Sequence, residues 1–173
     1  DEFTGLFNRR FLDEALETQF ARAAESGETL TFVMIDLDHF NELNETYGHE
    51  VGDEVIRAAA EIFKRCFAEE HIVARYGGDE FAALLPKTAT EEAQRRCEEV
   101  RAAVEALPIG DNSEAGNGTK LFRVTTSQGV AAYPAHASSK GELWEAADKA
   151  LYKAKERGRN CVALSDRLDK EDE

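Results

Sequence analysis

The feature that most constrains the fold is a Gly-Gly pair between two short apolar runs. Residues 75–81 read Arg-Tyr-Gly-Gly-Asp-Glu-Phe, with the run 71–76 ahead of the glycines and the run 80–85 behind them. Adjacent glycines between apolar runs are typical of a tight β-hairpin turn. The sequence therefore predicts two antiparallel neighbouring strands, with Asp79 and Glu80 at the turn that joins them.

A second acidic cluster follows another predicted strand. The β-branched and aromatic run 29–35 leads directly into Asp36-Leu37-Asp38. A Gly-Gly turn is common in hairpins, so the weight of the pattern comes from the two clusters together. Two acid-bearing elements that lie side by side are the minimum needed to hold Mg²⁺ against phosphates. A plain turn acid at the end of a strand is the alternative for Asp36.

The remaining pattern alternates helices with strands. Apolar spacing predicts helices over 11–24, 40–47, 53–67, 91–107 and 143–155. Strands are expected over 121–133, with a possible interruption at Gly129, and over 160–164. Residues 110–118 are expected to form a flexible loop, and the charged tail 165–173 to be frayed or to serve in interactions. This order predicts one α/β (α+β) domain, a mixed central sheet flanked by helices.

Charge and composition exclude several classes of function. The formal net charge is −14, with acids spread along the chain, whereas a protein that binds polymeric nucleic acid needs a basic face. A single nucleotide remains compatible, because a divalent ion and local cations can offset the repulsion. The cysteines lack metal-ligand spacing and are expected to be small buried hydrophobes in a reducing cytosol. The histidines show no paired spacing and are expected in solvent or loops.

Several segments, in matching order, resemble the GGDEF domain of diguanylate cyclases. The resemblance implies a fold related to nucleotidyl cyclase cores and polymerase palms, and the condensation of two GTP into cyclic di-GMP with release of pyrophosphate. It implies a cytoplasmic domain over 1–164, a tail over 165–173, and a parent whose N-terminal sensory or dimerisation region is absent; membrane anchoring of the parent is left open. The matching segments are 1–10, 36–40, 47–53, 75–81, 147–155 and 158–160.

The resemblance implies a centre that binds Mg²⁺ or Mn²⁺. Its ligands would be Asp36, the Leu37 carbonyl and Asp79, with Glu80 close by. Asp79 is also the proposed proton acceptor of the family; we favour the metal-ligand role, because a carboxylate bound to Mg²⁺ is a poor base. Asp38 is not usually counted as a ligand, and it shares a face with Asp36 only if the strand continues that far.

The resemblance also implies how GTP is held. Asn44 and Asp53 match the guanine-reading residues, although Asp53 alone would be interpreted as a helix N-cap. Lys155 and Arg159 match the cations that hold the β- and γ-phosphates; their alternative role is to complement the negative end of a helix. Gly77 and Gly78 would let the backbone approach the nucleotide without a Cβ clash.

The chain departs from the family pattern at two places. Many members carry Lys, thought to stabilise the transition state, where this chain has Asn41. A neutral amide can contact a phosphate but brings no charge, so turnover is affected more than GTP binding. Many members also bind the product at an Arg-x-x-Asp motif, which is absent here because Ala68 and His71 stand at its ends.

Three classes of function follow. The first is an active cyclase that works as a homodimer, each domain binding one GTP across a two-fold axis, with the isolated domain expected to be largely monomeric. The second is a catalytically weak GGDEF-like module that binds GTP or cyclic di-GMP for signalling, which Asn41 favours. The third is an acidic interaction domain, against which the matching segments argue.

Overall fold

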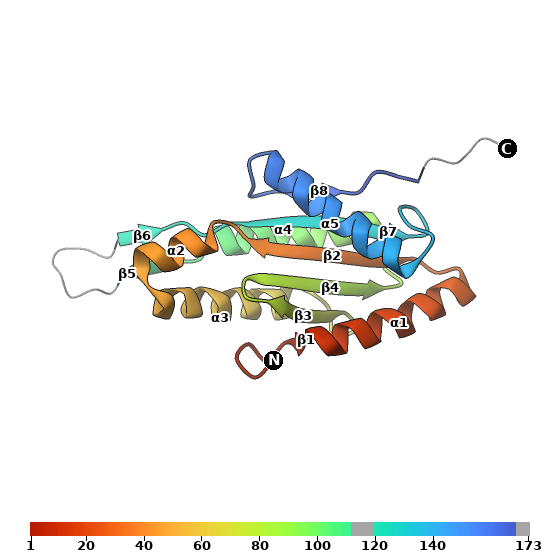
Figure 1. The fold of residues 1–173 in the computed structure, drawn as a ribbon, viewed down its shortest axis with the longest axis horizontal. Helices are drawn as coiled ribbons and strands as arrows, with labels where there is room; N and C mark the ends of the chain where they lie inside the picture. The colour runs from red at the N-terminus through yellow and green to blue at the C-terminus, as the bar shows by residue number, and fades with distance from the viewer. Residues whose placement is uncertain (112–119, 169–173) are drawn as a thin grey trace.

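The computed structural model describes residues 1–111 and 120–168. Helices and strands are interspersed along the chain (Figure 1). The elements are β1 (Phe7–Asn8), α1 (Arg9–Ser26), β2 (Leu30–Leu37), α2 (Phe40–Tyr47), α3 (His49–Cys66), β3 (Ile72–Gly77), β4 (Glu80–Pro86), α4 (Thr90–Glu105), β5 (Ile109–Asp111), β6 (Lys120–Phe122), β7 (Thr126–Tyr133), α5 (Lys140–Glu156) and β8 (Val162–Leu164).

The main sheet is mixed, as the sequence predicts. Its six strands run in the order β1-β3-β4-β2-β7-β8. The central strand β2 is antiparallel to β4 on one side and to β7 on the other. The edge strands β1 and β8 are parallel to their neighbours β3 and β7. The hairpin β3–β4 is therefore a direct neighbour of the strand that carries the other acidic cluster.

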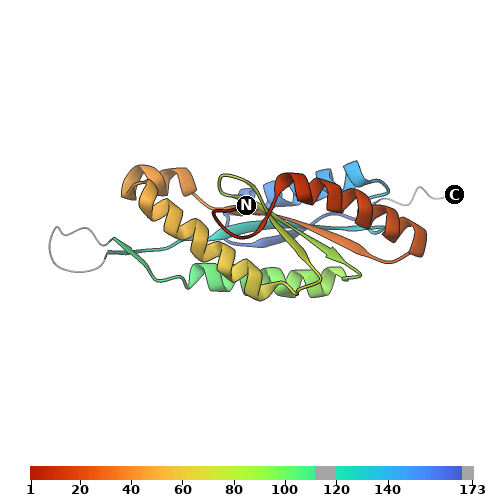
Figure 2. The ribbon, with the colours of Figure 1, turned by 90° about the horizontal axis from the view of Figure 1, so that it is seen from below.

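Helices cover both faces of this sheet (Figure 2). One core joins α3 and α4 to the β2 side chains Val33, Ile35 and Leu37, and the other joins α1 and α5 to Phe32 and Met34. Every residue of β2 is buried because both of its faces are covered. The alternation along the strand places Asp36 on the same face as Phe32 and Met34, toward α1 and α5.

The strand predicted over 121–133 is wrong in its continuity. The chain forms two strands, β6 and β7, separated at 123–125, and Gly129 lies inside β7 rather than at a break. A Cβ on Gly129 would lie 2.2 Å from the Leu151 backbone nitrogen of α5. The glycine therefore lets helix and strand backbones touch. Residues 112–119 of the expected loop and 169–173 of the tail lie outside the described residues.

One further interpretation is wrong. Helix α3 begins at His49, so Asp53 lies within the helix and is not its N-cap. His71 and His136 lie in loops, within the expectation of solvent or loops; both are buried there, and each ring accepts a hydrogen bond from a backbone N–H. Cys97 is buried as expected, whereas Cys66 and Cys161 are half-buried. Among the described residues, no helix has the length and apolar character needed to span a bilayer.

Candidate functional site

A polar pocket of about 210 Å³ opens at the C-terminal end of β2. At this point the chain turns into α2 (Figure 1). Segments far apart in the sequence meet there, because β2 lies beside β4 and beneath the last turn of α5. Its lining combines acids, amides and cations, namely Asp36, Leu37, Asp38, His39, Phe40, Asn41, Glu42, Asp79, Lys155 and Arg159.

Asp36 is one of two buried acids in the lining of this pocket, the other being Asp38. The residue Asp36 is only 8% exposed, and its Oδ2 forms an ion pair with Lys155 Nζ. Burial raises the pKa of Asp36 to about 6, Lys155 opposes that rise, and the nearby Asp79 adds to it. Oδ1 is buried and has no hydrogen-bond partner in the described part of the chain. A buried carboxylate oxygen in this condition is costly unless a cation or donor reaches it.

The hairpin turn brings Asp79 to the same place. The Leu37 N–H donates to the Asp79 carbonyl at 3.2 Å, which ties the turn to the end of β2. Arg75 donates to the Gly78 carbonyl at 3.0 and 2.8 Å and so closes the turn from below. This clamp role of Arg75 was missed from the sequence, which offers no signal for it beyond an Arg ahead of the glycines.

Glu80 lies opposite Asp36 in the β2–β4 register. Directly opposed residues of an antiparallel pair project from the same face, so the two carboxylates are neighbours across the strands. Glu80 is nevertheless exposed and does not line the pocket. Of the acids that the sequence predicts for the site, the pocket gathers Asp36 and Asp79 and leaves Glu80 at its margin.

Gly77 and Gly78 are not required by the fold of the turn. Neither has a positive φ. A Cβ on Gly77 would meet only the Glu80 carboxylate, at 3.8 Å, and a Cβ on Gly78 would meet nothing within 4 Å. The chain therefore leaves open space above both glycines, where a ligand could approach the backbone.

The cations of the pocket come from the end of α5 and the loop behind it. Lys155 lies in the last turn of α5, and Arg159 follows the helix with a φ of 66°. Asn41 reaches the pocket from the first turn of α2. Cations and amide thus face the carboxylates across a small volume, an arrangement suited to an anion held together with a metal ion.

Asn44 and Asp53 do not line this pocket. Asn44 is on α2, and its Oδ1 is buried without a hydrogen-bond partner among the described residues. A Cβ on Gly52 of α3 would lie 1.8 Å from that oxygen, so Gly52 makes room for the amide. Asp53 is the next residue of α3, and it is exposed. The two candidates lie on packed neighbouring helices beside the pocket.

The pocket contains oxygen atoms of the kind that bind a divalent cation. Asp36 and Asp79 supply carboxylates, and Leu37 could supply a carbonyl; hard cations prefer oxygen ligands of this kind. In the described ranges, no group of three or more His, Cys, Asp and Glu side chains is arranged to hold a metal ion. The unpartnered Oδ1 of Asp36 is the observation that favours a cation, and the residues present fit one.

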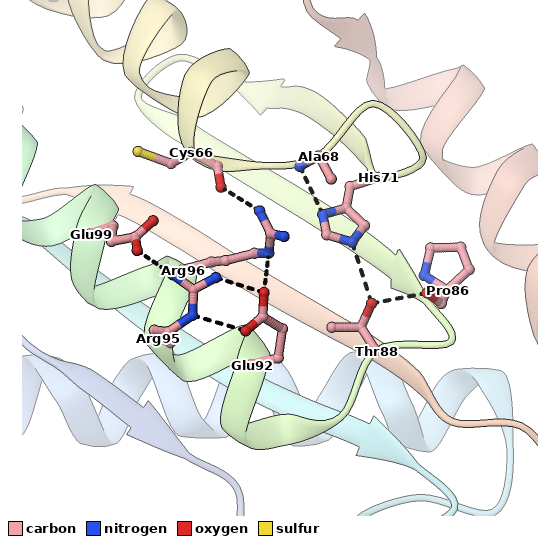
Figure 3. A network of polar contacts seen from close by, with 9 residues as sticks. All are labelled: Cys66, Ala68, His71, Pro86, Thr88, Glu92, Arg95, Arg96 and Glu99. Atoms are coloured by element: carbon pink, nitrogen blue, oxygen red, sulfur yellow. Dashed lines mark hydrogen bonds and ion pairs between the residues drawn. The ribbon is translucent and has the colours of Figure 1, made fainter.

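The place of the missing Arg-x-x-Asp motif is occupied by a hydrogen-bonded network, drawn in Figure 3. His71 Nδ1 accepts from the Ala68 N–H at 3.1 Å, and its Nε2 lies 3.3 Å from Thr88 Oγ1. Arg96 donates to the Cys66 carbonyl at 2.9 Å and pairs with Glu92 at 2.9 Å. Both ring nitrogens of His71 are thus used within the chain.

Comparison with known proteins places this geometry among GGDEF domains. Residues 1–161 match the family model described as "Diguanylate cyclase, GGDEF domain". The chain is 38% identical over 164 residues to the diguanylate cyclase DosC of Escherichia coli K12, covering 95% of this chain and 34% of DosC. It is 35% identical over 162 residues to the response regulator PleD of Caulobacter vibrioides, covering 94% of this chain and 35% of PleD. It spans about a third of the length of these relatives.

A solved structure shows the same fold. The GGDEF domain of DgcB from Caulobacter crescentus, solved in complex with c-di-GMP, superimposes with a TM-score of 0.87 at 37% identity. The alignment covers 95% of this chain and 94% of that one. The mixed sheet with helices on both faces is therefore the fold of that domain.

Proposed function

The chain belongs to the GGDEF domain family, and from that premise we propose that it is a diguanylate cyclase, which condenses two GTP into cyclic di-GMP and pyrophosphate. The proposal is supported by diguanylate cyclases among its relatives and by the product bound to a similar solved domain. The observation that carries it is the pocket at the end of β2, where Asp36 and Asp79 face Lys155 and Arg159. We assign this activity to residues 1–164 and treat 165–173 as a tail.

Asp36, Asp79 and the Leu37 carbonyl are the proposed ligands of Mg²⁺ or Mn²⁺, with Glu80 as their neighbour across the strands. A divalent ion held there would favour ionisation of a 3′-hydroxyl and offset charge that develops on the α-phosphate. The unpartnered Oδ1 of Asp36 supports this assignment, since burial of a bare carboxylate oxygen is unfavourable. Asp79 acts as a ligand in this proposal and not as the base.

Lys155 and Arg159 are the proposed partners of the β- and γ-phosphates. Without ligand, Lys155 neutralises Asp36. If a divalent cation and a triphosphate bind together, the cation becomes the new counter-ion of Asp36 and the triphosphate becomes the new partner of Lys155. The ion pair between Asp36 and Lys155 can then separate without leaving either buried charge unpaired. Arg159 would add bidentate donors to the same phosphates.

Asn44 and Asp53 are the proposed readers of guanine. The Watson–Crick edge of guanine presents adjacent N–H donors and an acceptor, which a carboxylate and an amide can match. Asp53 is exposed and free to accept, and the Asn44 carbonyl oxygen has no partner among the described residues. Adenine lacks that pair of donors, so these residues would select GTP. Gly77 and Gly78 would leave space for the nucleotide between the base and the phosphates.

Each domain is proposed to bind one GTP, so that two domains must face each other to form both bonds. Asn41 brings an amide but no charge to the phosphates, which lowers turnover in this proposal. Product inhibition at residues 68–71 is not expected, because Ala68 offers no cation and both ring nitrogens of His71 are already hydrogen-bonded. We place the domain in the cytoplasm, where GTP is available.

The second candidate is a GGDEF-like module that binds GTP or cyclic di-GMP and does not turn over. The neutral side chain of Asn41 in the pocket favours it. Product formation separates the two candidates, whereas nucleotide binding does not.

The test is incubation of concentrated protein with GTP and Mg²⁺, followed by chromatography for cyclic di-GMP. We expect product from GTP, none from ATP, and none from the Asp36→Asn variant, which removes a proposed ligand with little change of shape. Bound GTP without product would contradict the cyclase and leave the binding module. Absence of metal-dependent GTP binding would contradict both.

A further inference from the structure

Asp38 is the acid of the second cluster for which the proposed function has no use, and it is one of the most completely hydrogen-bonded side chains in the molecule. It is 7% exposed. Oδ1 accepts from Ser127 Oγ at 2.7 Å, and Oδ2 accepts from Thr125 Oγ1 at 2.7 Å and from the Asn160 backbone N–H at 3.0 Å. Asp36 offers an unpartnered oxygen, whereas donors of the chain itself occupy both oxygens of Asp38.

The Asn160 contact matters because of the backbone around it. Gly158, Arg159 and Asn160 have φ values of 104°, 66° and 47°. Left-handed backbone costs a residue with a Cβ about 1 kcal/mol or more, so consecutive left-handed residues need support from outside the loop. This loop follows α5 directly and carries Arg159 into the pocket.

The support comes from both sides of the loop. Asp38, at the end of β2, holds the backbone N–H of Asn160. Arg101 of α4 holds the side chain of Asn160, with Nη1 donating to Oδ1 at 3.1 Å. The Arg159 N–H donates to the Ala154 carbonyl at 3.1 Å. Of these contacts, the one to Asp38 connects the loop to the residue that directly follows β2, the strand that carries Asp36.

We propose that Asp38 is a positioning residue: by holding the Asn160 N–H it fixes the left-handed loop in the conformation that directs Arg159 into the pocket, and so sets the affinity for the nucleotide's terminal phosphates. This inference rests on the proposed function, in which the pocket binds GTP. The acidic cluster is then divided in its roles, with Asp36 facing the ligand and Asp38 holding the loop that faces it.

The test is a double-mutant cycle of Asp38→Asn and Arg159→Ala. The probes are 3′-deoxy-GTP with Mg²⁺, which lacks the attacking hydroxyl and cannot be condensed, and GMP, which lacks the β- and γ-phosphates. Loss of a charge-assisted contact predicts that Asp38→Asn weakens 3′-deoxy-GTP binding by about tenfold or more. For GMP, and for 3′-deoxy-GTP in the Arg159→Ala background, we expect a change of less than about twofold.

Equal losses for both nucleotides, or an undiminished loss in the Arg159→Ala background, would overturn the inference, because a general structural defect acts on every ligand. If Asp38→Asn does not fold, Arg101→Met removes the other contact to Asn160 and must show the same coupling to Arg159. If the unsubstituted protein binds no 3′-deoxy-GTP, the proposed function is contradicted, and the inference that rests on it is contradicted too. If the unsubstituted protein binds 3′-deoxy-GTP but the cycle shows no coupling between Asp38 and Arg159, only the inference is contradicted.

Discussion

Asp36 combines demands that oppose one another. Its side chain is buried at the end of an apolar strand, yet the proposed chemistry needs it charged. Burial raises its pKa from 3.8 to about 6. The folded protein therefore holds the proton more tightly than the unfolded chain does, and the charged form costs stability above about pH 6. At the candidate site, the ionised carboxylate of Asp36 therefore lowers the free energy of unfolding.

The Asp36→Asn variant should accordingly be more stable than the unsubstituted protein when no metal is present. We expect a gain of about 1–3 kcal/mol near pH 7.5, which shrinks as the pH falls through about 6, where the parent takes up its proton. Chemical denaturation in a chelating buffer measures the difference. Asp53→Asn, at an exposed position, is the matched control and should change little. Lower stability of Asp36→Asn near neutral pH would show that the Lys155 pair outweighs the burial.

A substitution at Asn41 should change the turnover rate more than it changes substrate binding. Asn41→Lys restores a cation in the first turn of α2, facing the pocket. We expect turnover to rise by about tenfold or more, with a smaller change in KM, since the added charge acts most strongly on the charge that develops in the transition state. Steady-state rates of product formation measure both. A lower KM with unchanged kcat would place the lysine in ground-state binding instead.

The sequence predicts single residues well where a strand pattern dictates their place. The hairpin and strand patterns predict both acid-bearing strand ends, and Asp36 and Asp79 lie in one pocket because the fold makes β2 and β4 neighbours. Asp38 could not be assigned, because its partners Thr125, Ser127 and Asn160 come from distant segments with no local signal. The burial of His71 in its loop could not be predicted for the same reason, since its partner Thr88 comes from another loop.

At the scale of elements, the contact of α5 with β7 depends on Gly129. A Cβ there would lie 2.2 Å from the Leu151 nitrogen and 2.3 Å from the Ala147 carbonyl oxygen, and backbone atoms cannot move aside as a flexible side chain can. Gly129→Ala should cost about 3 kcal/mol and lower Tm by about 5–10 °C. Because α5 carries Lys155, nucleotide affinity should fall as well.

Gly141→Ala is the matched control for that substitution. Gly141 lies in α5, the helix that packs against Gly129, and a Cβ on Gly141 meets nothing within 4 Å. Alanine should leave Tm unchanged or raise it slightly, since alanine favours helix over glycine. Equal melting temperatures for the two variants in thermal unfolding would contradict the close packing of α5 on β7.

His71 joins the connection before β3 to the connection after β4 (Figure 3). Burial lowers the pKa of His71 below 6.5, and Arg96 adds to this effect. The neutral ring accepts from the Ala68 N–H, which a protonated ring cannot do. Since the unfolded chain takes up the proton more readily, this contribution to stability is present above about pH 6.5 and is lost as the pH falls below it.

His71→Asn tests this assignment, because an amide oxygen can accept the same hydrogen bond but does not titrate. Between about pH 7.5 and 5.5, the parent should lose up to about 1 kcal/mol more stability than the variant does. Denaturation midpoints at both pH values measure the difference. Parallel losses in both proteins would show that His71 does not titrate in this range.

Element boundaries show what the sequence can and cannot indicate. The helix over 40–47 matches the structure, because apolar spacing and Gly48 mark its extent. The start of α3 was missed by several residues: Gly48 both ends α2 and caps α3, and the helix begins at once. The sequence left a possible interruption at Gly129, because the need for this glycine comes from its contact with α5, which no local pattern reveals.

At the scale of the whole molecule, the proposed site is half of a reaction centre. The pocket opens to solvent at one end of the sheet, and its proposed ligands can hold one triphosphate. A hydroxyl that attacks that phosphate must come from a second nucleotide, and in this account a second copy of the chain presents it. The mixed sheet and its helices could be predicted from the sequence. The association of two copies could not, because it leaves no sign in the sequence pattern or in the contacts within one chain.

The most direct test of the account is the rate of cyclic di-GMP formation from GTP and Mg²⁺, measured over a wide range of protein concentration. If two domains must meet, the rate per domain rises with concentration, and a fused dimerisation segment raises it further at low concentration. A rate per domain that does not depend on concentration in a monomeric protein would contradict the two-domain reaction. Complete absence of product from a protein that binds GTP, even as a forced dimer and with Asn41→Lys, would contradict the assignment as a cyclase.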